Sequence, residues 1–375
     1  MTWFFDFFYN EMRLDRRVGA CGSWRAGLDQ RSFGDLYPIA FGVALLGALT
    51  LTPVVRRLAL RSGLVDMPGE RRIHTAPLPL GGGVAMYAAF WLALFAAYPD
   101  RSRLAGLFLA TTVLVVVGLA DDYRELRWHT KLLGQLAAAG LFVALGDRIE
   151  FVTHPVTGNP VYIGWWGVPL TIFWLIALTN VVNLIDGLDG LAAGVCAIAA
   201  IPLFAVAHDL GRHEAALMTI ALGAAALGFL RHNFHPAKII MGDTGAMFLG
   251  FTLAAISVGG ALKGPATLAF VVPVLALGLP ILDTALAIVR RVAAGRPFYA
   301  RDTGHLHHRL LAVGLNQRQV ALTMYAASSC LAAAAAVVSG SVALFSVLAG
   351  LALVFGILPF SRSAVPKDAG RTRGA

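Results

Sequence analysis

Charged side chains are scarce in this chain. They make up 14% of its 375 residues, whereas hydrophobic residues make up 58%. A soluble domain carries roughly 25% charged residues, so this composition excludes an ordinary soluble protein. Cysteine is also rare. Cys21, Cys196 and Cys330 lie far apart, which excludes a disulfide framework and leaves no zinc-binding spacing. The sequence therefore predicts an integral membrane protein.

The first 35 residues lack a long apolar run. The aromatic stretch from Trp3 to Tyr9 is too short to span a bilayer, and no basic segment precedes an apolar one as in a signal peptide. We expect residues 1–35 to form a poorly ordered or interfacial tail. A transmembrane domain over residues 36–360 and a basic cytoplasmic tail over residues 361–375 follow it. The net charge of +9 is explained by membrane topology and indicates no nucleic-acid binding.

Long apolar runs occupy most of the remaining chain. A helix needs about 20 residues to cross about 30 Å of hydrocarbon, and eleven segments meet or approach that length. The predicted fold is therefore an all-α, polytopic transmembrane bundle of about eleven spans. The predicted spans are Leu36–Val55, Leu80–Tyr98, Leu104–Ala120, Leu132–Gly146, Trp165–Val182, Leu191–Ala207, Ala215–Leu230, Ala246–Leu262, Ala266–Val289, Val320–Ser339 and Val342–Phe360.

Lysine and arginine are unequally divided between the two sets of loops. The connections after odd-numbered spans, together with the C-terminal tail, hold twenty of them, and the other connections hold five. Cytoplasmic loops carry the excess of basic residues, so the N-terminus is predicted outside and the C-terminus in the cytoplasm. The same rule places every polar motif described below on the cytoplasmic side. On the opposite side, residues 147–164 are expected to form a small hairpin.

Carboxylate and amide side chains gather in short polar gaps at the ends of spans. Asp121 and Asp122 end the third span. Adjacent side chains on a helix diverge by about 100°, so we expect the two carboxylates to perform different tasks. One acts as a base or metal ligand, and the other orients a partner such as Lys131. A solvated helix end is the alternative explanation, because such pairs are common.

A second polar gap follows the fifth span. Asn180, Asn183, Asp186 and Asp189 recur every three residues, which places them near one face of a helical or 3₁₀ turn. Their oxygens are hard donors suited to Mg²⁺, and no sulfur or clustered-histidine set competes for a softer metal. Helix capping would explain one of these residues but not four.

A third motif, Gly242-Asp243-Thr244-Gly245, opens the eighth span. The N-terminus of a helix presents free N–H groups that bind anions. Asp243 is therefore predicted to hold Mg²⁺ that bridges a diphosphate. The alternative is that Asp243 simply caps its helix.

Three histidines, His305, His307 and His308, lie within four residues of a basic loop. Anionic lipid head groups explain basic residues here but not this histidine cluster. A zinc site at this cluster would lack clear Cys or second-cluster partners to complete its ligand set. Binding or stabilising the charge of a diphosphate explains the cluster better.

Other polar residues fit around these motifs. Arg71, Arg72 and His74 precede a glycine-rich segment and form a second candidate phosphate-binding element, although membrane topology alone also explains the arginines. Asn233 is a candidate hydrogen-bond partner for a base or sugar. Asp283 lies inside the ninth span and is expected to pair internally and support the site from below.

Taken together, these motifs resemble those of the polyprenyl-phosphate N-acetylhexosamine-1-phosphate transferases, the membrane family that includes phospho-N-acetylmuramoyl-pentapeptide translocase. The resemblance covers residues 36–330 in the family's order. It is carried by Asp66-Met67-Pro68 through Arg72-Ile73-His74 to Gly81-Gly82-Gly83; by Gly118 to Asp122 with Lys131; by Asn180 to Gly194; by Asn233 through Pro236-Ala237 to Gly250; and by His305-Leu306-His307-His308.

The resemblance implies a reaction between a lipid and a nucleotide sugar. A polyprenyl phosphate, such as undecaprenyl phosphate, attacks the β-phosphorus of a UDP-N-acetylhexosamine. UMP leaves, and a polyprenyl-diphosphate sugar remains in the membrane. Mg²⁺, for which Mn²⁺ is a candidate substitute, neutralises the diphosphate. The expected location is the bacterial inner membrane, with the active site facing the cytoplasm and the lipid product initiating synthesis of a cell-envelope polysaccharide.

The resemblance also implies roles for individual residues. Asp243 is the leading Mg²⁺ ligand, assisted by Asn183 or Asp189. Asp121 is the candidate base or positions the lipid phosphate, with Asp122 beside it. A base is not essential, because a phosphate monoester with a second pKa of about 6 is largely ionised near pH 7. Lys131, His305, His307 and His308 hold phosphates, and Asn183, Asp186 and Asn233 lie near the nucleotide.

The identity of the sugar rests on a smaller feature. The sequence His-Leu-His-His followed by Arg309 is similar to the branch of the family that uses UDP-N-acetylglucosamine. The peptidoglycan translocase typically has three consecutive histidines followed by an aromatic residue. Another UDP-N-acetylhexosamine or the muramoyl-pentapeptide substrate remains the alternative. A secondary transporter and an inactive scaffold are more distant alternatives, and the sequence leaves open whether the chain forms a homodimer.

Overall fold

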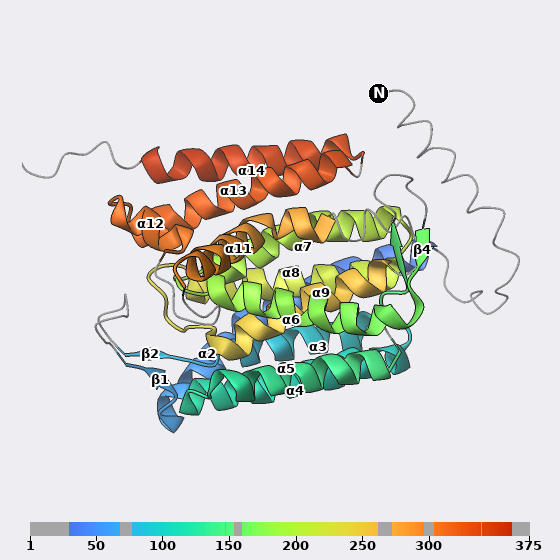
Figure 1. The fold of residues 1–375 in the computed structure, drawn as a ribbon, viewed down its shortest axis with the longest axis horizontal. Helices are drawn as coiled ribbons and strands as arrows, with labels where there is room; N and C mark the ends of the chain where they lie inside the picture. Colours follow the sequence, from blue (N-terminus) through green and yellow to red (C-terminus); the bar gives the residue numbers. More distant parts are fainter. Residues whose placement is uncertain are drawn as a thin grey trace, which may run out of the picture.

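The computed structural model describes residues 30–67, 77–146, 148–153, 160–261, 272–295, 304–338 and 340–361. Most helices run side by side along the long axis, with β1, β2 and α12 at one end and the β3–β4 hairpin at the other (Figure 1). The elements are α2 (Gln30–Ser62), β1 (Val65–Asp66), β2 (Leu78–Pro79), α3 (Gly82–Ala97), η1 (Arg101–Leu104), α4 (Ala105–Arg124), α5 (Trp128–Ala144), β3 (Phe151–Thr153), β4 (Pro160–Tyr162), η2 (Gly164–Trp166), α6 (Gly167–Ile185), α7 (Leu191–Asp209), α8 (His213–Asn233), α9 (Gly242–Ala261), α11 (Gly278–Ala293), α12 (Leu306–Ala312), α13 (Gln317–Val338) and α14 (Val342–Ser361).

Each predicted span overlaps one of these helices. Eight helices within the described ranges are long and apolar enough to cross a membrane: α2, α4, α6, α7, α8, α9, α13 and α14. The other three predicted spans fall on α3, α5 and α11, which have 16, 17 and 16 residues. The all-α polytopic fold is therefore confirmed. The number of spans and their orientation stay predictions.

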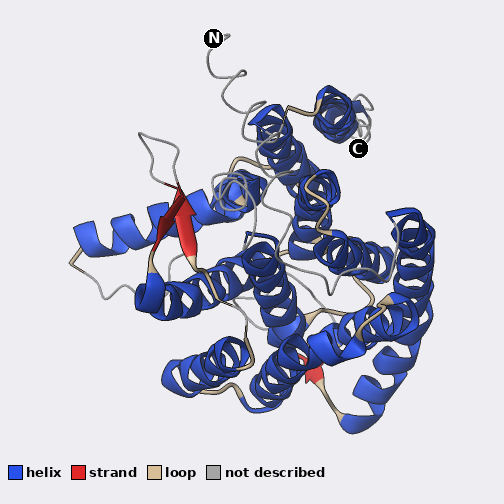
Figure 2. Ribbon diagram, turned by 90° about the vertical axis from the view of Figure 1, so that its right-hand side faces the viewer, coloured by secondary structure: helices blue, strands red, loops and turns tan. Residues whose placement is uncertain are grey.

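The predicted hairpin also forms. Strands β3 and β4 pair antiparallel with Phe151 opposite Tyr162, and they lie at the end of the bundle away from β1 and β2 (Figure 1). Seen from the hairpin end, many helices are viewed nearly end-on (Figure 2).

The predicted N-terminal tail is described only in its last residues. Helix α2 already begins at Gln30, and Phe33 stacks on His213 of α8 with ring centroids 5.1 Å apart. The helix thus begins before Leu36, the predicted start of the span. Residues 1–29 lie outside the described residues.

Helix α9 lies in the middle of the bundle and packs against α3, α4 and α6. Two glycines allow its N-terminus to approach so closely. A Cβ atom on Gly83 would overlap the backbone of Gly245, and one on Gly118 would lie 2.7 Å from the Thr244 nitrogen. Because both positions lack a side chain, α3 and α4 reach the first turn of α9, where the polar motifs meet.

Candidate active site

The N-terminus of α9 is held by a carboxylate from another helix. The Asp122 carboxylate, from the last turn of α4, accepts hydrogen bonds from the Asp243 backbone N–H at 2.7 Å and from the Thr244 hydroxyl at 2.6 Å. The Thr244 N–H donates to it at 3.4 Å. The sequence predicted that these amides bind a ligand anion. In the structure Asp122 itself occupies them, because a carboxylate stabilises a helix N-terminus.

Gly242 makes this arrangement possible. Its backbone has a φ of +70°, a conformation that favours glycine. A Cβ atom at this position would also lie 2.7 Å from the Asp122 carboxyl carbon. The backbone conformation and the close approach of Asp122 therefore explain why this position is glycine.

A second group of polar side chains lies beside this cap. The Lys131 ammonium, from α5, bridges the carboxylates of Asp121 and Asp243, at 3.2 Å from Asp121. The amide nitrogen of Asn183, at the end of α6, donates to Asp243 at 2.8 Å. These four residues come from four helices and are called the bridging cluster below. The two carboxylates are 13% and 27% exposed, so the cluster is shielded but open to a ligand.

Asp121 and Asp122 therefore perform different tasks, as their divergence on the helix predicted. Asp121 contacts Lys131 and accepts the Leu126 N–H at 2.7 Å, whereas Asp122 turns to α9. The Asn180 amide is displaced from the cluster. It exchanges hydrogen bonds with the Gln135 amide.

The other two predicted carboxylates, Asp186 and Asp189, lie in the loop after α6. Burial raises the pKa of Asp186 to about 8, and the nearby carboxylates of Asp122 and Asp189 add to the effect. Asp189 accepts hydrogen bonds from His235 Nδ1 at 2.8 Å and from the Ala237 N–H at 3.1 Å. Asp186 is therefore largely protonated at pH 7 in this structure, and a cation beside it would favour its ionised form. Asp189 anchors the loop before α9.

Asn233 is buried, with 2% of its surface exposed. Its carbonyl oxygen accepts the Gly190 N–H at 3.0 Å, and its amide nitrogen donates to the Ile239 carbonyl at 2.9 Å. In this structure it therefore joins the loop after α6 to the loop before α9. The predicted contact of Asn233 with a nucleotide stays a prediction.

The histidine motif is positioned by Asp283 of α11. One oxygen of this carboxylate lies 2.9 Å from His305 Nδ1, and the other accepts the Leu306 N–H at the start of α12, also at 2.9 Å. His305 and Asp283 are both buried. The prediction that Asp283 pairs internally is confirmed, and its partner belongs to a predicted site motif.

His307 brings this motif to the polar gap after α6. It is 2% exposed, and a Cβ atom on Gly187 would lie 2.7 Å from its Nε2 atom. Its ring lies parallel to that of His305, and the His308 ring centroid is 4.2 Å away. Burial lowers the pKa of His307 to about 4, with further lowering by the neighbouring His308 and His305. His307 is therefore neutral at pH 7 and offers hydrogen bonds rather than charge.

The structure thus brings most predicted site residues to one end of the bundle. His74 lies outside the described residues. Sequence reasoning gave no role to Thr244 or His235, which contact Asp122 and Asp189. It also missed Gln135, although a glutamine inside a predicted span is a signal of an internal partner.

The sequence profile of the family described as Glycosyl transferase family 4 matches residues 104–261, a range that includes α4, α5, α6 and α9. These four helices are the ones that carry the bridging cluster.

Three similar proteins show more closely which family the chain belongs to. "Probable undecaprenyl-phosphate N-acetylglucosaminyl 1-phosphate transferase" of Bacillus subtilis is 38% identical over 76% of this chain and 80% of its own length. "Decaprenyl-phosphate N-acetylglucosaminephosphotransferase" of Mycobacterium tuberculosis is 38% identical over 73% of this chain and 75% of its own. "Phospho-N-acetylmuramoyl-pentapeptide-transferase" of Listeria welshimeri is 31% identical over 59% and 73%. The chain belongs to the family of polyprenyl-phosphate N-acetylhexosamine-1-phosphate transferases.

Proposed function

We propose that this protein transfers N-acetylglucosamine 1-phosphate from UDP-N-acetylglucosamine to undecaprenyl phosphate in the bacterial inner membrane, in a reaction that requires Mg²⁺. The bridging cluster is the observation that carries the proposal. Four helices bring Asp121, Lys131, Asn183 and Asp243 together at one end of an apolar bundle. A reaction between a soluble nucleotide sugar and a lipid needs phosphate-binding groups at such a place.

The donor atoms of the cluster fit Mg²⁺. Asn183 uses its amide nitrogen on Asp243, so its carbonyl oxygen is the atom available to a cation. No group of three His, Cys, Asp or Glu side chains within the described ranges is arranged to hold a metal ion. Mg²⁺ needs no such group, since it is usually held by one or two carboxylates together with substrate phosphates and water. Asp243 is the proposed ligand, assisted by Asn183. Asp189 is a weaker candidate because its carboxylate binds His235 and Ala237.

In the proposed reaction an oxygen of the lipid phosphate forms a bond to the β-phosphorus of the UDP-sugar. The bond from that phosphorus to the oxygen shared with the α-phosphate breaks, and UMP leaves with that oxygen. When bound, Mg²⁺ neutralises negative charge on the diphosphate. Lys131 contributes a positive charge beside both carboxylates and holds a phosphate. Asp121 positions the lipid phosphate, which is already largely ionised near pH 7.

The histidine motif has a different task. His305 is oriented by Asp283, and His307 lies against Gly187. We assign to His305, and to His308 next to His307, hydrogen bonds to the phosphates of the donor. Preorganised donors of this kind stabilise charge that develops in the transition state.

Transfer of radiolabel tests the proposal. Membranes that contain the protein are incubated with radiolabelled UDP-N-acetylglucosamine and undecaprenyl phosphate, with and without Mg²⁺. We expect label in the lipid fraction only when Mg²⁺ is present, and loss of that signal in Lys131→Met. Lys238→Met is the matched control, because this lysine is exposed and its described hydrogen bonds are made by backbone atoms, which the substitution keeps. No lipid-linked label with any UDP-N-acetylhexosamine would refute the enzyme assignment.

A panel of donors tests the sugar. We expect UDP-N-acetylglucosamine to give the largest kcat/KM. Preference for the UDP-muramoyl-pentapeptide would instead assign the chain to the branch of its Listeria relative. The proposed cytoplasmic orientation is tested separately by labelling a single cysteine placed at Arg127, beside the cluster, in sealed inverted vesicles and in intact cells.

A further inference from the structure

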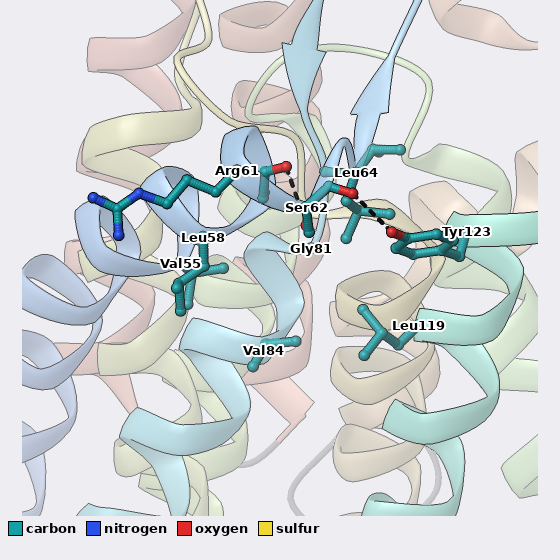
Figure 3. A pocket seen from close by; sticks show the side chains of 11 residues that line it. Val55, Leu58, Arg61, Ser62, Leu64, Gly81, Val84, Leu119 and Tyr123 are labelled. Atoms are coloured by element: carbon teal, nitrogen blue, oxygen red, sulfur yellow. Dashed lines mark hydrogen bonds between the residues drawn. The ribbon is translucent and has the colours of Figure 1, made fainter.

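A cavity of about 500 Å³ lies at the same end of the bundle as the bridging cluster but outside it. Its walls come from the last turns of α2, the start of α3 and the last turn of α4. Val55 and Leu58 form one side, and Val84 and Leu119 lie across from them (Figure 3). The volume is that of a ligand pocket, and the walls are mainly apolar.

The cavity has one charged side chain at its edge. Arg61 is exposed and lies above Leu58 (Figure 3). The phenol of Tyr123 is already used, because its hydroxyl donates to the Ser62 carbonyl at 2.7 Å. A ligand would therefore meet an apolar chamber with a guanidinium group at its mouth.

The mouth opens on the outer surface of the bundle. Leu58 and Tyr123 are 56% and 57% exposed, and Leu119 is 37% exposed. Both α2 and α4 are long and apolar enough to cross a membrane, and in that placement this exposed surface would lie against lipid near the ends of the two helices. An occupant reaches the cavity from the bilayer.

The cavity and the bridging cluster lie on different faces of α4. Leu119 and Tyr123 each lie two residues from Asp121, and two residues correspond to about 200° around a helix. A lipid whose phosphate is bound at Asp121 would have to pass around α4 to place its chain in the cavity. This separation argues against the acceptor lipid of the transfer reaction as the occupant.

We propose that the cavity binds one acyl chain of an anionic phospholipid, with the phosphate of that lipid beside Arg61. Basic pockets between membrane helices bind anionic head groups, and burial of each CH₂ group adds to the affinity. The lipid would brace the turn of α4 that also carries Asp121 and Asp122. This inference does not depend on the proposed transfer reaction.

Lipid binding to the purified full-length chain tests the proposal without any turnover. Native mass spectrometry counts bound phosphatidylglycerol, and separately phosphatidylcholine with the same acyl chains. Val84→Phe fills the cavity, and its control Val116→Phe adds the same volume at an exposed position of α4 outside it. Arg61→Gln removes the charge, and Arg127→Gln removes an exposed charge elsewhere at this end.

We expect one tightly bound phosphatidylglycerol in the unmodified chain and in both controls, and none in Val84→Phe. Arg61→Gln should weaken phosphatidylglycerol binding about fivefold, the effect of one arginine near an anionic lipid, and leave phosphatidylcholine unchanged. Because Arg61 is exposed, this variant tests the proposal even where Val84→Phe does not fold. Equal binding of the two lipids, or unchanged binding in Arg61→Gln, would overturn the proposal. Displacement of phosphatidylglycerol by equimolar undecaprenyl phosphate would also overturn it and identify an acceptor site.

Discussion

The two ends of the bundle both hold polar side chains that contact one another, but their chemistry differs. At the hairpin end, Tyr37 lies 2.8 Å from His213 Nδ1 and 3.4 Å from His208 Nδ1, and its ring packs edge-on against Phe204. These partners are uncharged or weakly basic and satisfy one another. At the other end, Lys131 lies between the carboxylates of Asp121 from α4 and Asp243 from α9.

The difference distinguishes a structural cluster from the cluster proposed to bind substrate. Polar side chains cost little when hydrogen-bond partners or water satisfy them, as at the hairpin end, where His208 is exposed. Carboxylates in excess over their cations remain costly until a further cation or hydrogen-bond donor arrives. The end with the charge imbalance is therefore the end prepared for a ligand.

The largest effect should come from Asp243→Asn, which keeps the shape of the side chain and removes its charge. We expect a fall in kcat of about 100- to 1,000-fold, the range seen when one group that stabilises transition-state charge is lost. Measuring rate against Mg²⁺ concentration checks this. Near-normal turnover at limiting Mg²⁺ would rule out the metal assignment.

The second-largest effect is expected for Asp122, which lies at the candidate site and also accepts hydrogen bonds from the start of α9. Asp122→Ala should lower the free energy of unfolding by about 1–3 kcal/mol, because the amides and hydroxyl at the start of α9 lose their acceptor. Thermal unfolding of the purified protein measures this. Asp121→Ala is the matched comparison. If it destabilises the chain as much as Asp122→Ala, the division of tasks between the two residues is wrong.

A smaller effect is expected from Asp283→Asn. The remaining amide oxygen can still accept the Leu306 N–H, whereas His305 loses its carboxylate partner. We expect kcat to fall about tenfold, the lower limit for removing a supporting carboxylate from a functional histidine. The thermal midpoint should change little. Kinetics that are unchanged would show that Asp283 supports only the fold.

The smallest effect belongs to the hairpin end. Tyr37→Phe removes the hydroxyl that contacts His208 and His213 and should cost about 1 kcal/mol of stability. Transferase activity should not change, since the bridging cluster lies at the opposite end. A loss of activity comparable with that of Asp283→Asn would contradict the contrast between the two ends.

Much of the fold was predictable because apolar length is a strong signal in a membrane chain. The spans, the hairpin and the meeting of Asp121, Asn183 and Asp243 followed from hydropathy and from the order of the loops. Such reasoning gives the end of the bundle at which a side chain lies but not its neighbours. That Asp122 caps α9, or that Asn233 joins two loops, depends on helix rotation and on contacts between distant segments.

Charge states were harder to predict than positions. Nothing in the sequence indicated that His307 is neutral, because its low pKa comes from burial, and burial depends on packing that the local sequence does not show. The apolar cavity next to Arg61 left no sequence signal either, because its lining residues are ordinary members of lipid-facing helices.

The glycines that admit α3 and α4 to the first turn of α9 have a consequence for genetic variation. Gly83 and Gly118 have no proposed contact with substrate, yet even a methyl group at either position would collide with the backbone beside Thr244 and Gly245. A saturation screen for growth should therefore score these two positions as intolerant as the carboxylates themselves. A position that tolerates no substitution in this protein is therefore not always a substrate-binding or catalytic position, since close contact between helices gives the same result.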